Sequence, residues 1–204
     1  MLLPSSNSDV DSNSILFKHD CIYRHNIMCV SYTTYNVQCE EDILHPSTCQ
    51  HNIVVLDGQV NDDTTASGHF HPFAYGQVLG IYHINAIYIG PGMINYQPIH
   101  LKFLRVWWYR RIPSYDSWTV YKLDRLKFYS VENSDIFSFV DPLDVLCGCH
   151  IIPRFQEGRC HSDGNGVSLC ARDGLDWKEY YVNRSVAAFA VEQQTLIFRL
   201  VQIC

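Results

Sequence analysis

Charged residues and long apolar runs are both scarce in this 204-residue chain. Only 18% of the residues are charged, and the 15 Lys and Arg residues are scattered, with the densest run between Arg105 and Arg111. Nucleic-acid binding through phosphates needs clustered basic residues, and a membrane-spanning helix needs about 20 mostly apolar residues. Because neither pattern occurs, we expect no membrane contact, and nucleic acid is a disfavoured partner. The net charge of −6 favours a basic partner, such as a Lys- and Arg-rich peptide tail.

The N-terminal residues lack the features of an export signal. After Met1 the chain has only a short apolar stretch before a polar Ser/Asn/Asp tract, and no basic segment precedes a long apolar one. We therefore expect an intracellular protein. Its nine cysteines, an odd number, are then expected to stay reduced and to form no disulfides.

Motifs of the common catalytic centres are also lacking. The sequence contains no Gly-x-Ser-x-Gly elbow, no phosphate-binding loop and no dinucleotide-binding glycine motif. Nucleophilic catalysis needs an activated Ser or Cys beside a base. The adjacent pair Cys149-His150 does not suit this role, because neighbours on a strand point to opposite faces. We therefore predict that the chain is not an enzyme and binds no cofactor.

A group of Cys and His residues between positions 147 and 170 is the one candidate metal site. These residue types are the ones that zinc prefers; they are Cys147, Cys149, His150, Cys160, His161 and Cys170. However, no Cys-x-x-Cys knuckle is present. Cys147 and Cys149 lie in an apolar run typical of a buried strand, where cysteine behaves as a small hydrophobic residue. We therefore predict that no metal is bound.

Short apolar runs separated by turn residues are what the sequence has in abundance. Such runs are typical of strands, and they cover residues 27–37, 52–56, 75–89, 101–109, 119–129 and 145–152. A helical pattern begins only near Asp176, which could cap a helix over the following residues. We predict a mainly β fold, a small and partly open β-barrel with short helical additions near the C-terminus.

The domain organisation follows from the same pattern. Residues 1–20 are expected to be a disordered tail, because their Ser/Asn/Asp-rich part cannot bury apolar area. Residues 21–184 are expected to form a single β-rich domain. Residues 185–204 are a C-terminal extension, predicted to be a short helix or to lie at the periphery, although the apolar run near their end is also compatible with a strand.

The run over residues 101–109 is the most informative part of the sequence. Period-two alternation places Leu104, Val106 and Trp108 on one face and Phe103, Arg105, Trp107 and Tyr109 on the other. Aromatic residues on both faces indicate a central strand or part of a binding surface. The alternative is that the strand simply packs on both sides.

Several segments, read in order, resemble the bromo-adjacent homology (BAH) domain, a β-rich module of chromatin proteins. The segment Val106-Trp107-Trp108-Tyr109-Arg110 resembles its Val-x-Trp-aromatic-x-Arg motif. The other matching segments are Tyr35–Val37, His51–Leu56, Gly76–Tyr82 and Asp144–Pro153. The likeness covers roughly residues 32–155, and the shared order of the segments is its main support.

A closer likeness is to a domain near the C-terminus of Plavaka-type transposon proteins of mushroom-forming fungi. It rests on Tyr32–Val37, Gly80–His83, Phe139–Pro142, Gly148–Pro153 and Asp176–Arg184. After Arg184 the family pattern continues Phe-Val-Asp-Arg-Asp-Met, whereas this chain reads Ser-Val-Ala-Ala-Phe. The resemblance implies a transposon-derived domain, but it implies no activity.

Together the resemblances imply a non-catalytic recognition module that binds a chromatin partner, such as a modified histone tail, in the nucleus. Two alternatives remain open: a nucleic-acid-binding accessory domain of a transposon protein, and a non-functional transposon remnant. Several readers of the BAH class hold methylated lysine among aromatic rings. The resemblance implies such a cage from Tyr75, Trp108 and Tyr129, with Glu132 as its acidic neighbour. The alternative is that Trp108 packs beneath Leu104 and Val106 as ordinary core.

Overall fold

The computed structural model describes residues 14–33, 39–56, 73–92, 94–112, 123–129, 136–166, 173–183 and 200–203. Most of these residues lie in strands, which confirms the mainly β prediction. The strands are β1 (Ile15–His25), β2 (Met28–Thr33), β3 (Cys39–Leu44), β4 (Asn52–Leu56), β5 (Phe73–Tyr88), β6 (Ile99–Ile112), β7 (Asp124–Phe128), β8 (Phe137–Val140), β9 (Val145–Gly148), β10 (His150–Pro153), β11 (Tyr180–Asn183) and β12 (Leu200–Ile203). Three short 3-10 helices, η3 (Pro142–Asp144), η4 (Phe155–Glu157) and η5 (Asp173–Leu175), connect the later strands.

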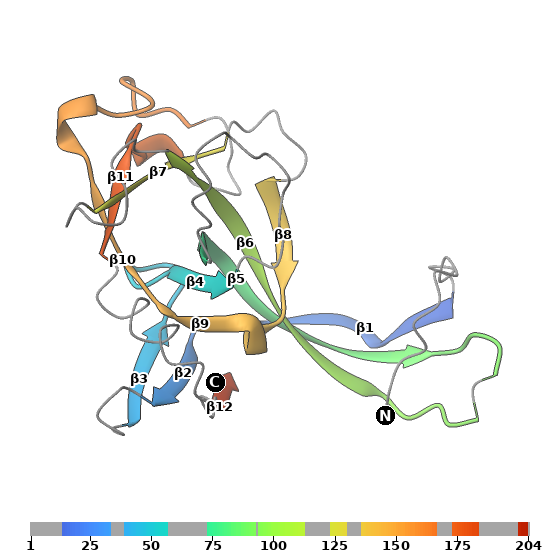
Figure 1. Ribbon diagram of the computed structural model, residues 1–204. Helices are drawn as coiled ribbons and strands as arrows, with labels where there is room; N and C mark the ends of the chain where they lie inside the picture. Colours follow the sequence, from blue (N-terminus) through green and yellow to red (C-terminus); the bar gives the residue numbers. More distant parts are fainter. Residues whose placement is uncertain are drawn as a thin grey trace, which may run out of the picture.

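The main sheet has nine strands and is open. Its path runs β10-β11-β7-β6-β5-β4-β9, while β1 pairs with β5 and β8 pairs with β6. Within the described residues, no strand pairing joins the two ends of this path. However, β9 and β10 are separated by Cys149 alone. One short segment therefore pairs with β4 at its start and with β11 at its end, so the sheet bends back on itself around a shared core (Figure 1).

The long strands β5 and β6 form the centre of this sheet. They pair in antiparallel register from Gly76 opposite Trp108 to Ala86 opposite Ile99. The register shifts between Val78 and Gly80, where β5 contains a bulge. β6 is central in the sheet. It packs on both sides, which was the alternative to a binding surface, since Leu104, Val106 and Trp107 are all buried.

The core lies inside the bend of the sheet. Aliphatic residues of β4, β5 and β6 form it together with residues of β9 and β11. Three successive residues of β4, Ile53, Val54 and Val55, are buried. This is the pattern of a strand covered on both faces rather than of one exposed to solvent on one side.

A second sheet of three strands, in the order β12-β2-β3, packs beside the first. Met28 and Val30 of β2 and Leu44 of β3 are buried in the same core as the main sheet. A hydrogen bond links the sheets, because the backbone amide of Gly148 donates to Oδ2 of Asp42 at 2.8 Å. The two sheets therefore share one hydrophobic core.

Three expectations about the chain ends need correction. First, β1 begins at Ile15, so residues 15–20 form part of a strand instead of a disordered tail; residues 1–13 lie outside the described part. Second, the helix expected after Asp176 is replaced by β11, where Tyr180 and Val182 alternate into the core. Pairing with β10 and β7 outweighs the local helical pattern. Third, Leu200–Ile203 form a strand, which is the alternative that the apolar run left open, and not the helix; residues 184–199 lie outside the described part.

No helix among the described residues has the length and apolar character that crossing a membrane requires.

Candidate functional site

The strand register separates the two central members of the predicted aromatic cage. Trp108 lies opposite Gly76 in the β5–β6 pair, and residues directly opposite one another share a face. Tyr75 precedes Gly76 on β5, so its side chain points to the other face. Its ring is also only 2% exposed and belongs to the core. Tyr75 and Trp108 therefore do not form two walls of one cage.

The other proposed cage residues do not restore it. Tyr129 follows the end of β7 and is 37% exposed, while Glu132 lies outside the described residues. Trp108 is half-buried and packs against the core, and its Nε1 donates a hydrogen bond to Oγ of Ser138 at 2.6 Å. This position agrees with the alternative interpretation of Trp108 as a packing residue.

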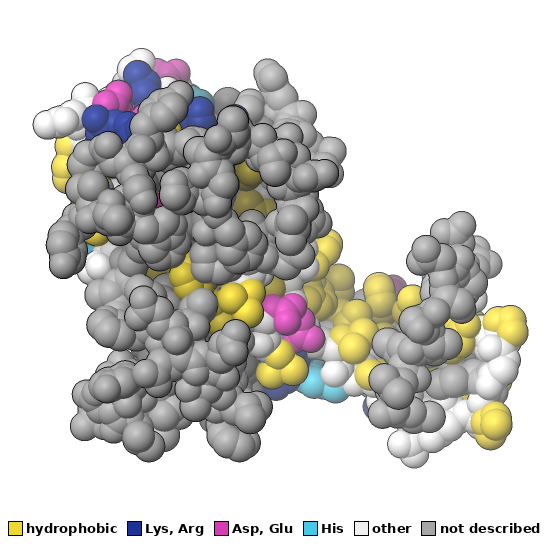
Figure 2. Space-filling view, in the orientation of Figure 1, with side chains coloured by type: hydrophobic (Ala, Val, Ile, Leu, Met, Phe, Trp, Pro, Cys, Tyr) yellow, Lys and Arg dark blue, Asp and Glu magenta, His cyan; other side chains and the backbone are white. Residues whose placement is uncertain are grey.

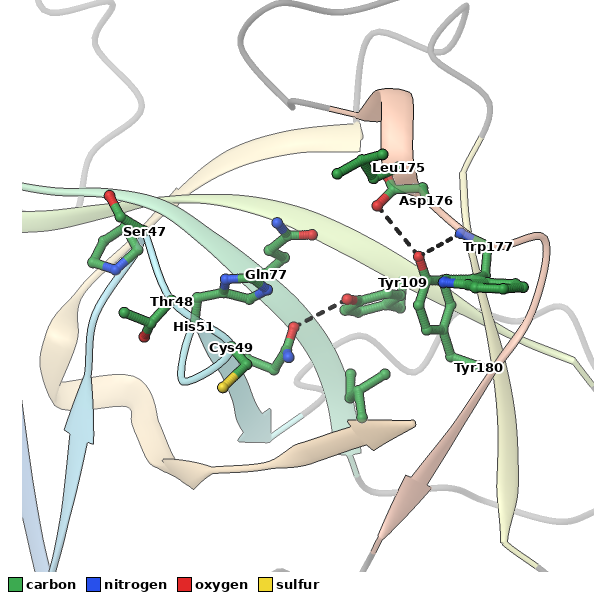
Figure 3. Close-up of a pocket in the computed structure, with 13 residues that line it drawn as sticks. Ser47, Thr48, Cys49, His51, Gln77, Tyr109, Leu175, Asp176, Trp177 and Tyr180 are labelled. Carbon is green, nitrogen blue, oxygen red and sulfur yellow. Dashed lines mark hydrogen bonds between the residues drawn. The ribbon is translucent and has the colours of Figure 1, made fainter. Parts of the chain in front are cut away.

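A different group of aromatic residues lines a cavity of about 410 Å³ on the other side of β6 (Figure 3). The turn Pro46–Cys49 and the start of β4 form one wall, and the segment Leu175–Tyr180 forms another. The central strands contribute Gln77 and Tyr109, and β10 contributes Ile151. The cavity thus lies where the N-terminal and C-terminal parts of the domain meet.

Three aromatic residues of the cavity come from two segments far apart in the sequence. Tyr109 and Tyr180 have ring centroids 5.8 Å apart with planes at 70°, so their rings meet edge to face. Trp177 follows in the same wall (Figure 3). Behind it, the ring of Phe155 packs edge-on at 4.9 Å, and the guanidinium of Arg159 lies 5.3 Å from the ring centroid of Trp177. These contacts hold the indole in place.

Asp176 is the acidic residue of this cavity. Its Oδ1 accepts a hydrogen bond from the hydroxyl of Tyr180 at 3.3 Å, and that hydroxyl also accepts one from the backbone amide of Trp177 at 2.9 Å. Oδ2 of Asp176 is buried without a hydrogen-bond partner among the described residues. Burial raises the pKa of Asp176 to about 7; the Tyr180 hydrogen bond opposes this, and the charge of Asp173 adds to it.

The opposite wall is held by Asn52 and His51 at the start of β4. Oδ1 of Asn52 accepts a hydrogen bond from the hydroxyl of Tyr109 at 3.0 Å, which holds the tyrosine ring in position. The backbone carbonyl of His51 accepts from the amide of Val78 at 2.7 Å. Burial lowers the pKa of His51, partly opposed by the backbone of Thr48. The imidazole is therefore neutral at physiological pH.

The chemistry of the cavity suits binding of a cation better than proton transfer by the tyrosines. Burial raises the pKa of both Tyr109 and Tyr180 well above its ordinary value, so both remain neutral phenols. With His51 also neutral, Asp176 is the group of this wall that changes charge near pH 7. The cavity then combines aromatic surfaces with a single carboxylate, an arrangement that attracts a cationic group.

The Cys and His residues considered for zinc are dispersed through the fold. Cys147 is buried in β9. Burial raises the pKa of Cys149 well above its ordinary value, and the charges of Cys147 and Asp42 raise it further. His161 instead faces Asp173, with Nε2 3.4 Å from Oδ2. No group of three potential ligands in the described part of the chain could hold a metal ion. Cys170 lies outside that part, so the prediction of no metal stays a prediction.

Comparisons with protein-family models, with curated proteins and with solved structures give no match to this chain. The family is therefore not shown. The resemblances to the BAH domain and to the Plavaka-type domain stay predictions, and the site is argued from its own geometry.

The sequence alone does not reveal this site, for two reasons. Period-two alternation places Tyr109 on the face opposite Trp108, but the BAH-like motif points to Trp108 as the binding residue. The local pattern after Asp176 predicts a helix and gives no sign that Asp176 and Tyr180 line a cavity. The available signal was its composition, since Asp176, Trp177 and Tyr180 place a carboxylate and two aromatic rings within five positions.

Proposed function

We propose that this chain is a non-catalytic recognition module that binds a cationic side chain of a basic peptide in the cavity beside Tyr109, Trp177 and Tyr180. A modified histone tail is the leading candidate. The BAH-like architecture, the nuclear location and the transposon origin belong to the same proposal, because all three come from the resemblances. The observation that carries it is the grouping of three aromatic residues and one carboxylate around a single cavity.

Cation–π attraction explains why such a cavity would select a methylated ammonium group. The face of an aromatic ring attracts a cation, and the attraction grows when the cation is desolvated. A methylated ammonium group gives up water more easily than an unmodified one, because it has fewer donors to satisfy. The cavity of about 410 Å³ falls within the roughly 300–1,000 Å³ range of small-ligand sites. It has room for one such side chain.

Asp176 supports the proposal through its charge. A bound cation favours the ionised carboxylate, and its free pKa is about 7. Binding and ionisation are therefore coupled, so the affinity for a cationic peptide should rise as the pH increases from 6 to 8. The net charge of −6 acts in the same direction by attracting basic peptides over longer distances.

A peptide-binding experiment tests the proposal. The purified chain is titrated with histone-tail peptides carrying unmodified, monomethylated, dimethylated or trimethylated lysine, and with duplex DNA in parallel. We expect at least one methylated peptide to bind more tightly than its unmodified form. Trp177→Ala should weaken that binding about tenfold or more, since a desolvated cation–π contact contributes about 2 kcal/mol. Asp176→Asn should remove its dependence on pH.

Tyr129→Ala is the matched control, because Tyr129 is an exposed aromatic residue that does not line the cavity. It should leave peptide binding unchanged. Equal losses in Trp177→Ala and Tyr129→Ala would contradict the assignment of the cavity. Binding to DNA without any peptide binding would favour the accessory-domain alternative instead. Thermal melting of each variant separates lost binding from lost folding.

A further inference from the structure

The strand β1 buries little surface against the rest of the domain. It belongs to an arm that projects from the body and consists of β1, residues 82–88 of β5 and residues 99–103 of β6 (Figure 1). Among the described strands, β1 pairs with β5 alone. The residues from Ile15 to Arg24 are all exposed, and His25 is half-buried. Because few apolar contacts hold β1, modest interactions with β5 decide whether it stays paired.

The pairing of β1 with β5 is also interrupted. The register shifts between Phe17 and Ile22, and the two strands pair through residues 15–17 and 22–25 of β1. The second of these stretches lies next to the body, because His25 pairs with the buried Ile81. Its side chains make the contacts that link β1 to the two strands beside it.

Three histidines, one from each strand of the arm, come together on one face. His83 of β5 is the central member. Its Nδ1 lies within hydrogen-bond distance of Nε2 of His25 on β1, and its ring centroid is 4.5 Å from that of His100 on β6. Tyr23 of β1 stacks on His83, with centroids 4.6 Å apart and planes at 6°. Figure 2 shows histidine side chains (cyan) where the arm leaves the body.

The groups around His83 offer no negative charge to balance added protons. Those that face it from the neighbouring strands are Tyr23 and His25 of β1, and His100 and Lys102 of β6. Lys102 lies directly opposite His83 in the strand register. Asp20 is the only carboxylate in the three segments of the arm. It lies in the interrupted part of the β1–β5 pairing and is not among the charges that act on His83.

Added protons break the hydrogen bond of the cluster and bring like charges together. A hydrogen bond between two imidazoles needs one neutral ring as the acceptor, because a protonated imidazole has only donors. A proton on both His25 and His83 therefore removes the bond. Burial lowers the pKa of His83, and the charges of His100, His25 and Lys102 lower it further. With a lowered pKa, the stability present above the ordinary value of 6.5 is lost as the pH falls below it.

We propose that protonation of the cluster formed by His25, His83 and His100 releases β1 from β5, so that the arm is a pH-sensitive switch. At neutral pH the hydrogen bond between the rings of His25 and His83 holds β1 in place. As the pH falls from about 7 to about 5, the rings acquire positive charge and repel one another and Lys102. Release leaves residues 82–88 of β5 unpaired on one side. Because an unpaired strand edge can pair with another strand, the switch controls access to this edge.

Hydrogen exchange at two pH values tests the switch. The protection factors of the amides of residues 22–25 are compared at about pH 7.5 and about pH 5, on either side of the titration of histidine. They are corrected for intrinsic exchange rates, and a chelator keeps metal ions off the imidazoles. We expect at least about tenfold lower protection at the lower pH, which corresponds to a shift of about one pKa unit. Equal protection at both pH values would overturn the proposal.

The core strand β4 is the internal reference for this measurement. It lies between β5 and β9, away from the arm, so its amides should keep their protection at the lower pH. If β4 loses protection together with β1, the whole domain unfolds in acid and the arm is not a separate switch.

His83→Gln tests whether the cluster senses the pH. Glutamine keeps a polar side chain at the centre of the face but takes up no proton, so β1 should have about the same protection at both pH values. His150→Gln is the matched control, because His150 is an exposed histidine of β10, outside the arm. It should leave the acid-induced loss unchanged. A loss that persists in His83→Gln, or that His150→Gln abolishes, would contradict the assignment to this cluster.

Discussion

At the scale of single residues, burial decides the charge state of the candidate site. Asp176 shares a cavity wall with Tyr180 and Trp177, and its Oδ2 is buried with no hydrogen-bond partner among the described residues. Its pKa rises to about 7 as a result. An aspartate side chain in water is ionised at pH 7, whereas Asp176 is close to half protonated at this pH. A ligand that supplies positive charge would relieve this unfavourable environment.

The raised pKa of Asp176 has a direct consequence for stability. The folded chain holds the proton up to about pH 7, whereas the unfolded carboxyl loses it near pH 4. Because the folded state binds more protons in this window, stability falls as the pH rises through it. Asp176→Asn should therefore raise the unfolding free energy at pH 8, on the order of 1 kcal/mol after allowance for partial exposure. It should change the unfolding free energy little at pH 4.

Urea unfolding of the wild type and of Asp176→Asn at pH 4 and pH 8 measures this difference. Asp163→Asn serves as the comparison, because backbone and side-chain hydrogen bonds from Asn165 lower the pKa of Asp163. A lowered pKa stabilises the fold above pH 4, so removing this carboxylate should reduce stability at pH 8. If Asp176→Asn is destabilising at pH 8, the carboxylate is better solvated than its burial indicates.

At the scale of strands, Gly76 allows β5 to pair with β6 where the side chains of Val106 and Trp108 on β6 lie against the glycine. A Cβ atom at this position would overlap Cγ1 of Val106 and approach Cε3 of Trp108 to 3.0 Å. Overpacking of this kind typically costs about 1–3 kcal/mol. Gly76→Ala should reduce the unfolding free energy by that amount, as measured by urea unfolding. Gly148→Ala is the control, since its Cβ would meet Asp42 at ordinary contact distances; similar losses in both variants would exclude this explanation.

Several of the strands could be predicted from the sequence, but their partners could not. The apolar runs at 52–56, 101–109 and 145–152 correspond to β4, β6 and the β9–β10 segment. Period-two alternation placed Trp108 and Tyr109 on opposite faces, as observed. The pairing of Gly76 with Trp108 depends on tertiary register, which a single strand does not encode. For that reason the predicted cage joined side chains from opposite faces.

The same limit applies to the cavity. It requires Tyr109 to meet Tyr180, 71 positions later in the chain. Local pattern assigned the segment after Asp176 to a helix, and pairing with β7 and β10 overrode it. Non-local pairing therefore determines the cavity for which we propose binding.

At the scale of the whole molecule, β12 completes a small sheet without being part of the main one. It pairs with β2 from Leu200 opposite Ser31 to Ile203 opposite Met28, whereas the strands of the main sheet pair among themselves. Truncation after residue 199 would thus remove one of the two partners of β2 and leave its backbone groups exposed. Met28 and Val30 would still be held by β3 and by the shared core. We expect local loosening and an intact main sheet.

Hydrogen exchange distinguishes local loosening from global unfolding. In the truncated chain, amides of residues 28–33 should exchange at least about tenfold faster, which corresponds to a local loss of roughly 1.4 kcal/mol. Amides of Leu104 and Val106 in β6 should keep their wild-type protection, because their partners in β5 and β8 are unaffected. Unchanged exchange in β2 would mean that β12 contributes no stability. Loss of protection in β6 would mean that the two sheets unfold as one cooperative unit, since their side chains share one core.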